Sequence, residues 1–170
     1  ELWVPADRSR TVSDVVRECT DVDVVAATVY NHYRTALDDE SEPSPFRRLE
    51  WRDSVPLGLP KVACRWRPDL VIAQGNHAAS YSKPAGGCVS GVLEVHHYPY
   101  RSRGQVLRKI RNGAAAYAAS NLPREMGLHW RELGVTLDSV DGEAKIDSHM
   151  AAWFFFDDPE GSAMVRDPVL

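Results

Sequence analysis

The residues best suited to chemistry stand in one stretch, 93–102, which reads Leu-Glu-Val-His-His-Tyr-Pro-Tyr-Arg-Ser. We predict a buried strand ending at His96 and His97 and a turn at Pro99, because a proline favours extended backbone in the residue before it. Imidazole nitrogens bind metals, and the guanidinium of Arg101 suits phosphate oxygens. Adjacent strand residues point to opposite faces, so only one of the two histidines can face a given site. The junction predicts a metal site, a phosphate site or both, with ordinary packing histidines as the alternative.

A helix is expected directly after this junction. Ser102 and Gln105 have the spacing of a capping box, in which two polar side chains satisfy free N–H groups of the first turn. The N-terminus of a helix favours an anion, and this helix adds positive charge at Arg103, Arg108, Lys109 and Arg111. Arg101, Ser102 and Lys109 are therefore our candidates for phosphate contacts, with simple solvation of the basic residues as the alternative.

A second group of polar residues, Gly75-Asn76-His77, follows a predicted strand at 70–74. Glycine permits unusual backbone angles or the close approach of a ligand. Polar side chains at the ends of strands are a common feature of sites in α/β proteins. We predict that Asn76 and His77 bind substrate, although ordinary turns use the same residues.

Hydrophobic and β-branched patterns predict the elements that must position these residues. Helices are expected at 11–19, from 102 to before 121, at 123–133 with an end at Gly134, and at 141–150; strands are expected at 21–33, 61–66, 70–74 and 89–97. A turn at Pro68-Asp69 joins the two middle strands. The order of elements predicts the α/β class, with a mixed sheet of about four or five strands flanked by helices.

Four further segments complete the chain. The acidic, proline-containing run 38–45 predicts a solvated loop or a mobile flap over a site, and 80–87 predicts a loop. Residues 46–52 mix aromatic rings with arginines, which is typical of a short strand or a binding segment. The apolar run 152–156 is expected in the core or beneath a partner.

Composition narrows the class of protein. The chain has 170 residues, 44% of them hydrophobic, and a net charge of −4, so no global basic field indicates nucleic-acid binding. Its three cysteines form no CxxC pair, which argues against a zinc ribbon or disulfide framework and favours a reducing compartment. No apolar run reaches the ~18 residues of a membrane span, and no signal peptide is recognisable. We expect a cytoplasmic location, either free or peripheral to a membrane.

Taken together, these motifs resemble the C-terminal portion of a bacterial family 2-like glycosyltransferase of A-type fold. The resemblance covers most of residues 1–113. Its most specific part is His-Tyr-Pro-Tyr-Arg-Ser at 97–102 with the downstream Lys109. The other matching residues are Glu1-Leu-Trp-Val-Pro, Phe46 to Arg48, Lys61, Gly75-Asn-His77 and Gly113.

The resemblance implies transfer of a sugar from a nucleotide-diphosphate sugar to a hydroxyl acceptor, such as a carbohydrate. In this family an Asp-x-Asp-Glu segment holds a divalent metal, manganese or magnesium, and the metal holds the diphosphate. Glu1-Leu-Trp resembles the continuation of that segment, so the nucleotide-binding half is expected upstream of Glu1, and the chain alone can be inactive. His97 is then a further metal ligand. The general base is Glu1 or Glu94.

On this interpretation residues 1–122 form the acceptor and metal side of an α/β domain, and 123–170 form a helical and irregular extension packed on it. We expect His77, His97, Arg101 and Lys109 to converge beside Glu1. The sequence leaves open whether the chain forms a homo-oligomer.

Two alternatives remain from the sequence. A metal-dependent phosphoester hydrolase would use His77, His96 or His97 with Asp53 or Asp69, and it needs several carboxylates beside the histidines. A non-catalytic interaction domain would dock a partner on the apolar run Trp153–Phe156.

Overall fold

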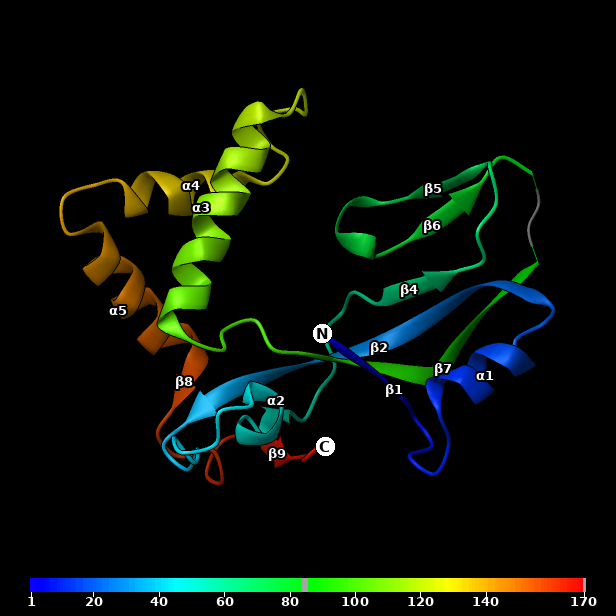
Figure 1. Ribbon diagram of the computed structural model, residues 1–170, viewed down its shortest axis with the longest axis horizontal. Helices are drawn as coiled ribbons and strands as arrows, with labels where there is room; N and C mark the ends of the chain where they lie inside the picture. The colour runs from blue at the N-terminus through cyan, green and yellow to red at the C-terminus, as the bar shows by residue number, and fades with distance from the viewer. Residues whose placement is uncertain (84–85, 170) are drawn as a thin grey trace.

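A computed structural model describes residues 1–83 and 86–169 of the chain (Figure 1). Two long strands, β2 (Val22–Thr35) and β7 (Gly87–His97), pair in parallel at the centre of a mixed sheet. β-branched residues recur along both strands, as expected for strands with buried neighbours. The other members of the sheet are β1 (Leu2–Pro5), β3 (Trp51–Asp53), β4 (Lys61–Cys64), β8 (Phe155–Phe156) and β9 (Met164–Arg166).

The sheet order is β1-β7-β2-β3-β9, with β4 and β8 also paired to β2. β8 runs parallel to β2, and the remaining outer strands pair antiparallel. The predicted α/β class with a mixed sheet is thereby confirmed at this coarse level, but in the described part of the chain the sheet has seven strands and not the four or five expected. Its closer likeness to an A-type transferase stays a prediction.

The helices lie in separate places around the sheet. The first, α1 (Val12–Glu18), begins at Thr11, whose hydroxyl accepts from the Asp14 amide while the Asp14 carboxylate accepts from the Thr11 amide. A short α2 (Pro45–Arg48) precedes β3. Figure 1 shows the last three helices gathered on one side of the molecule: α3 (Arg103–Ala119), α4 (Leu128–Leu137) and α5 (Gly142–Phe154).

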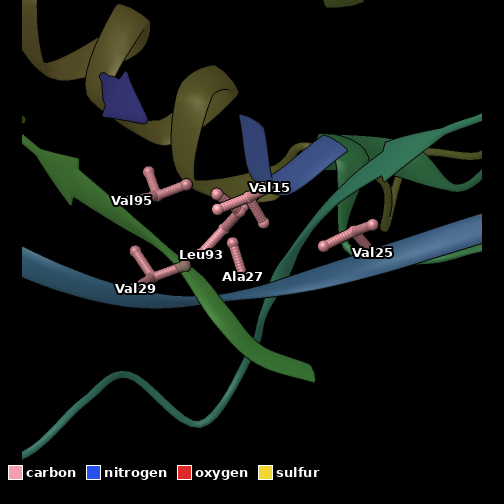
Figure 2. Packing of buried hydrophobic residues seen from close by; sticks show 6 residues of the cluster. All are labelled: Val15, Val25, Ala27, Val29, Leu93 and Val95. Atoms are coloured by element: carbon pink, nitrogen blue, oxygen red, sulfur yellow. The ribbon is translucent and has the colours of Figure 1, made fainter. Parts of the chain in front are cut away.

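The core has two parts. Figure 2 shows the first, where Val15 of α1 meets the apolar side chains of β2 and β7: Val25, Ala27, Val29, Leu93 and Val95. The second lies among the last three helices and comprises Val106, Leu107, Ile110, Leu137 and Ile146. Burial of each large aliphatic side chain stabilises the folded state by roughly 1.5–3 kcal/mol relative to leaving that side chain in water. The two clusters therefore fix the helices and the sheet on either side of the 97–102 junction.

Several predicted elements need correction. Residues 45–48 are helical, because Pro45 suits the first turn of a helix and the Leu49 amide closes that turn on the Pro45 carbonyl. The strand at 70–74 is the shorter β5 (Leu70–Ile72), which pairs with β6 (Ala79–Tyr81) in a separate two-stranded sheet. β6 therefore occupies part of the loop expected at 80–87, of which residues 84 and 85 lie outside the described residues.

Gly134 does not end a helix, as the sequence suggested, but lies buried inside α4. A Cβ atom at this position would lie 2.5 Å from the Cβ of Ala114 on α3. The glycine is there because it lets two helices approach closely, and α4 accordingly starts and ends later than expected. Among residues 1–83 and 86–169, no helix is both long and apolar enough to cross a membrane.

Candidate functional site

The alternation of strand β7 places its two adjacent histidines in different surroundings. His96 is fully buried and lies against His32, with 2.7 Å between His96 Nδ1 and His32 Nε2. His97 pairs in register with Asn31 of β2 and borders two hollows in the surface. The two side chains therefore lie in different surroundings, and of the two only His97 borders a hollow.

The first hollow, which we call the apolar hollow, has a volume of about 480 Å³. Its walls come from β2, the loop before β4, the turn after β5, the 97–100 junction and helices α3 to α5. Most of its lining is apolar or aromatic: Val29, Leu57, Gly58, Leu59, Pro99, Tyr100, Trp130, Leu133 and Phe154. Its polar lining residues are Asn31, Lys61, His77, His97, Lys109 and His129.

The second, the basic hollow, has a volume of about 700 Å³ and is lined by Glu1, His97, Tyr98, Arg101, Gln105, Arg108, Lys109, Asn112, Gly113 and Trp130. The spacing of Gln105, Arg108, Lys109 and Asn112 puts all four on one face of α3. His97, Lys109 and Trp130 border both hollows. These three side chains therefore form a shared wall between an apolar and a charged space.

His97 is held as a neutral imidazole. Its Nδ1 lies 2.9 Å from Asn31 Oδ1, to which it donates; Asn31 in turn donates to the Tyr33 hydroxyl, and that hydroxyl donates to Asp53. Burial, and then the positive charge of Lys109, lower the pKa of His97 to about 4. With Nδ1 occupied, the lone pair of Nε2 has no partner among the described residues and is available to a ligand.

Positive charge gathers at the shared wall. Burial, and then the charge of Arg101, lower the pKa of Lys109 from its usual value, and Lys61 acts in the same direction. Within the described part of the chain Lys109 forms no ion pair, and its Nζ lies over the ring of Trp130, 5.5 Å from the ring centroid. Glu1 is the carboxylate at this wall, 3.4 Å from Lys61 Nζ. Among the described residues, Lys61, Arg101 and Lys109 therefore lie near the single carboxylate of this wall, Glu1.

Trp130 is positioned by a glycine on the neighbouring helix. A Cβ atom at Gly113 would lie 2.8 Å from Trp130 Cδ2, so only glycine lets the indole rest on α3 at this point. Tyr100 and Phe154, whose ring centroids are 3.4 Å apart, also line the apolar hollow. A contact between Gln74 and the Tyr117 hydroxyl joins the turn after β5 to α3.

The remaining predicted substrate residues divide into those at the hollows and those elsewhere. His77 lines the apolar hollow and is fixed by a 2.7 Å hydrogen bond from Nδ1 to the Pro60 carbonyl. Asn76, which has a positive φ of 59°, donates to the Val62 carbonyl and lines neither hollow. Ser102 caps α3 by accepting from the Gln105 amide at 3.3 Å, and its hydroxyl also lies outside both hollows.

Glu94, the other candidate base, lies on the far face of β7 with His96. Arg8 reaches both, with its Nη2 2.8 Å from Glu94 Oε2 and 2.9 Å from His96 Nε2. His32 donates from Nδ1 to the Leu49 carbonyl, which completes a buried chain of polar contacts. The structure therefore brings Glu1, His77, His97, Arg101 and Lys109 together around the hollows and keeps Glu94 apart.

Sequence reasoning did not assign a site role to Asn31 or Trp130, and Lys61 entered only as part of the resemblance. Asn31 carried a usable signal, since a polar residue late in a long apolar strand requires a partner. Trp130 carried none, because an aromatic residue in an amphipathic helix normally indicates packing. The segment 46–52 lines neither hollow; Phe46 packs edge-on against Tyr98.

The fit to a divalent metal can be tested on the donor atoms present. His97 offers one nitrogen ligand of the kind that metal sites use, with its other nitrogen already bound. Among residues 1–83 and 86–169, no three His, Cys, Asp or Glu side chains form a group able to hold a metal ion. The described residues therefore offer His97 as a single ligand, and a divalent metal bound there would need oxygen ligands from elsewhere.

Comparisons of the chain with known protein families, with curated proteins and with solved structures give no match.

Proposed function

We propose that this chain forms the diphosphate- and acceptor-binding part of a metal-dependent glycosyltransferase, which moves a sugar from a nucleotide-diphosphate sugar to an acceptor hydroxyl. The observation that carries the proposal is the convergence of Lys61, Arg101 and Lys109 on a single carboxylate, Glu1. Surplus positive charge at a partly buried hollow favours an anionic ligand. The resemblance of the 97–102 segment supports a diphosphate as that anion.

The reaction assigns a task to each group at the shared wall. The acceptor oxygen attacks C1 of the sugar, the bond from C1 to the diphosphate oxygen breaks, and its electron pair leaves with the diphosphate. Arg101 and Lys109 stabilise the charge that develops on that leaving group. The hydroxyl proton passes to a base, and Glu1 is the carboxylate that lies at this wall.

A bound manganese or magnesium ion supplies further neutralisation of the diphosphate oxygens. His97 would hold it through Nε2, since its Nδ1 proton is directed to Asn31. The neutral state of His97 at pH 7 follows from its pKa of about 4 and leaves the lone pair free.

The binding step is tested by calorimetry with pyrophosphate and with uridine, guanosine and thymidine diphosphates, each with and without manganese. Lys109→Met removes one charge-assisted contact, worth roughly 1.5–3 kcal/mol, so affinity should fall about ten- to a hundredfold. Lys145→Met, on the exposed part of α5, is the matched control and should bind as the wild type does.

The transfer step is tested by mass spectrometry of products formed from nucleotide-diphosphate sugars and a panel of hydroxyl acceptors. A glycosylated acceptor together with free nucleoside diphosphate supports the proposal. Absence of diphosphate binding up to about 1 mM, or release of free sugar in place of any glycosylated acceptor, contradicts it.

A further inference from the structure

We infer that the acceptor carries an apolar or aromatic group beside its reactive hydroxyl and that the apolar hollow holds this group. The inference rests on the proposed function, because it names the class of that function's acceptor. It concerns the apolar hollow, which shares only the wall of His97, Lys109 and Trp130 with the basic hollow, so a substitution on its other side tests the inference separately.

The first support is the chemistry of the two hollows. The basic hollow has charged and amide side chains along one face of α3, which suits the diphosphate. The apolar hollow, at about 480 Å³, is the size of a small-molecule pocket, and aromatic rings stand at its walls: Tyr100, Trp130 and Phe154. A free sugar has hydroxyls on almost every carbon and would leave most of this apolar lining without a partner. An apolar group attached to the acceptor would cover it.

The second support is the loop before β4. Leu57 and Leu59 line the apolar hollow, yet they remain 41% and 60% exposed. An apolar ligand that covers these two leucines removes their surface from water, which favours the free energy of binding by roughly 25 cal/mol for each Å² covered.

The third support is the position of the shared wall. His97 and Lys109 border both hollows, and the diphosphate contacts lie on one side of them. A hydroxyl held at this wall by an apolar group on the other side would stand next to the leaving diphosphate. Such an arrangement is what orientation of two reactants requires.

The test compares benzyl with methyl glycosides of glucose, galactose, mannose and N-acetylglucosamine, titrated by calorimetry with pyrophosphate and manganese present. For at least one sugar, the benzyl form should bind about tenfold tighter or better. Leu59→Asn should reduce that preference at least threefold. Val55→Asn should not, because Val55 is exposed on the same loop and lines neither hollow. Far-UV circular dichroism checks that both variants fold.

Equal affinity for benzyl and methyl forms of all four sugars overturns the inference, and so does an equal effect of the two variants. Uridine, which has no phosphate, is added as a competitor of the benzyl glycoside. If uridine displaces the glycoside, the apolar hollow binds a nucleotide base, and the inference is overturned. Pyrophosphate binding without a benzyl preference rejects this inference alone. A benzyl preference without any pyrophosphate binding rejects the proposed function and the acceptor assignment with it.

Discussion

Lowering the pH from 7 to 5 should destabilise the fold through the buried pair His32 and His96. Both side chains are almost wholly buried, and burial is the main cause that lowers the pKa of each to about 4. In the unfolded chain each returns to the ordinary value near 6.5, so the unfolded state binds more protons between pH 4 and 6.5. The stability contributed by the neutral pair is therefore complete above pH 6.5 and is lost as the pH falls through this window.

The magnitude follows from these pKa values. Between pH 7 and pH 5, a histidine whose pKa falls from about 6.5 to about 4 on folding lowers the free energy of unfolding by about 2 kcal/mol. Two such residues give about 4 kcal/mol, a large part of the 5–15 kcal/mol typical of a folded domain. Further groups face the pair: the positive charges of Arg8 and Arg52 oppose protonation of His96, whereas Asp167 favours it. Glu94 also faces the pair, with its Oε2 3.4 Å from His96 Nε2.

The assay is urea unfolding at pH 7, 6 and 5, followed by tryptophan fluorescence. His96→Gln removes one titrating group, so the variant should be less stable at pH 7 but should lose about 2 kcal/mol less than the wild type by pH 5. His149→Gln, on the exposed surface of α5, is the control and should follow the wild type. The reasoning is refuted if the wild type loses less than about 1 kcal/mol, or if His96→Gln loses as much as the wild type.

Two other substitutions test the packing and the helix start. Gly134→Ala places a methyl group against Ala114, so the free energy of unfolding should fall by about 1–3 kcal/mol. Gly104→Ala in α3 is the control, because its added methyl group would contact only the Arg108 side chain, at 3.5 Å. It should leave the free energy of unfolding unchanged or raise it in the same urea experiment. Thr11→Ala removes the hydroxyl that begins α1 and should cost about 1 kcal/mol, whereas Ser13→Ala, exposed in the first turn, should cost nothing; equal effects of the two would contradict the capping assignment.

The sequence was informative wherever local chemistry decides structure. Thr11 and Asp14 predicted the start of α1, and the run from Val22 predicted the long strand β2. Ser102 predicted the start of α3, although only half of the capping box forms: the Gln105 side chain accepts from the Arg101 amide at 3.3 Å. These signals are reliable because they depend on residues three or four apart or on alternation along one strand.

The rest depended on contacts between distant segments. The two-stranded β5–β6 sheet and the helical interior position of Gly134 follow from pairing and close packing that no local pattern records. The same holds for the candidate site. His97, Arg101 and Lys109 are near in sequence and were foreseen as a group, whereas Trp130 reaches the shared wall only because α4 packs on α3 at Gly113.

Strand β7 separates the part of the molecule that supports the fold from the part proposed to bind ligands. On one face, Glu94 and His96 belong to the contacts that tie Arg8 and His32 together. On the other, His97 stands at the wall between the two hollows. Because successive side chains of a strand point in opposite directions, one residue step divides these roles. Variants of His96 should therefore change the pH dependence of stability and leave diphosphate binding unchanged, whereas variants of His97, whose pKa is also about 4, should change both.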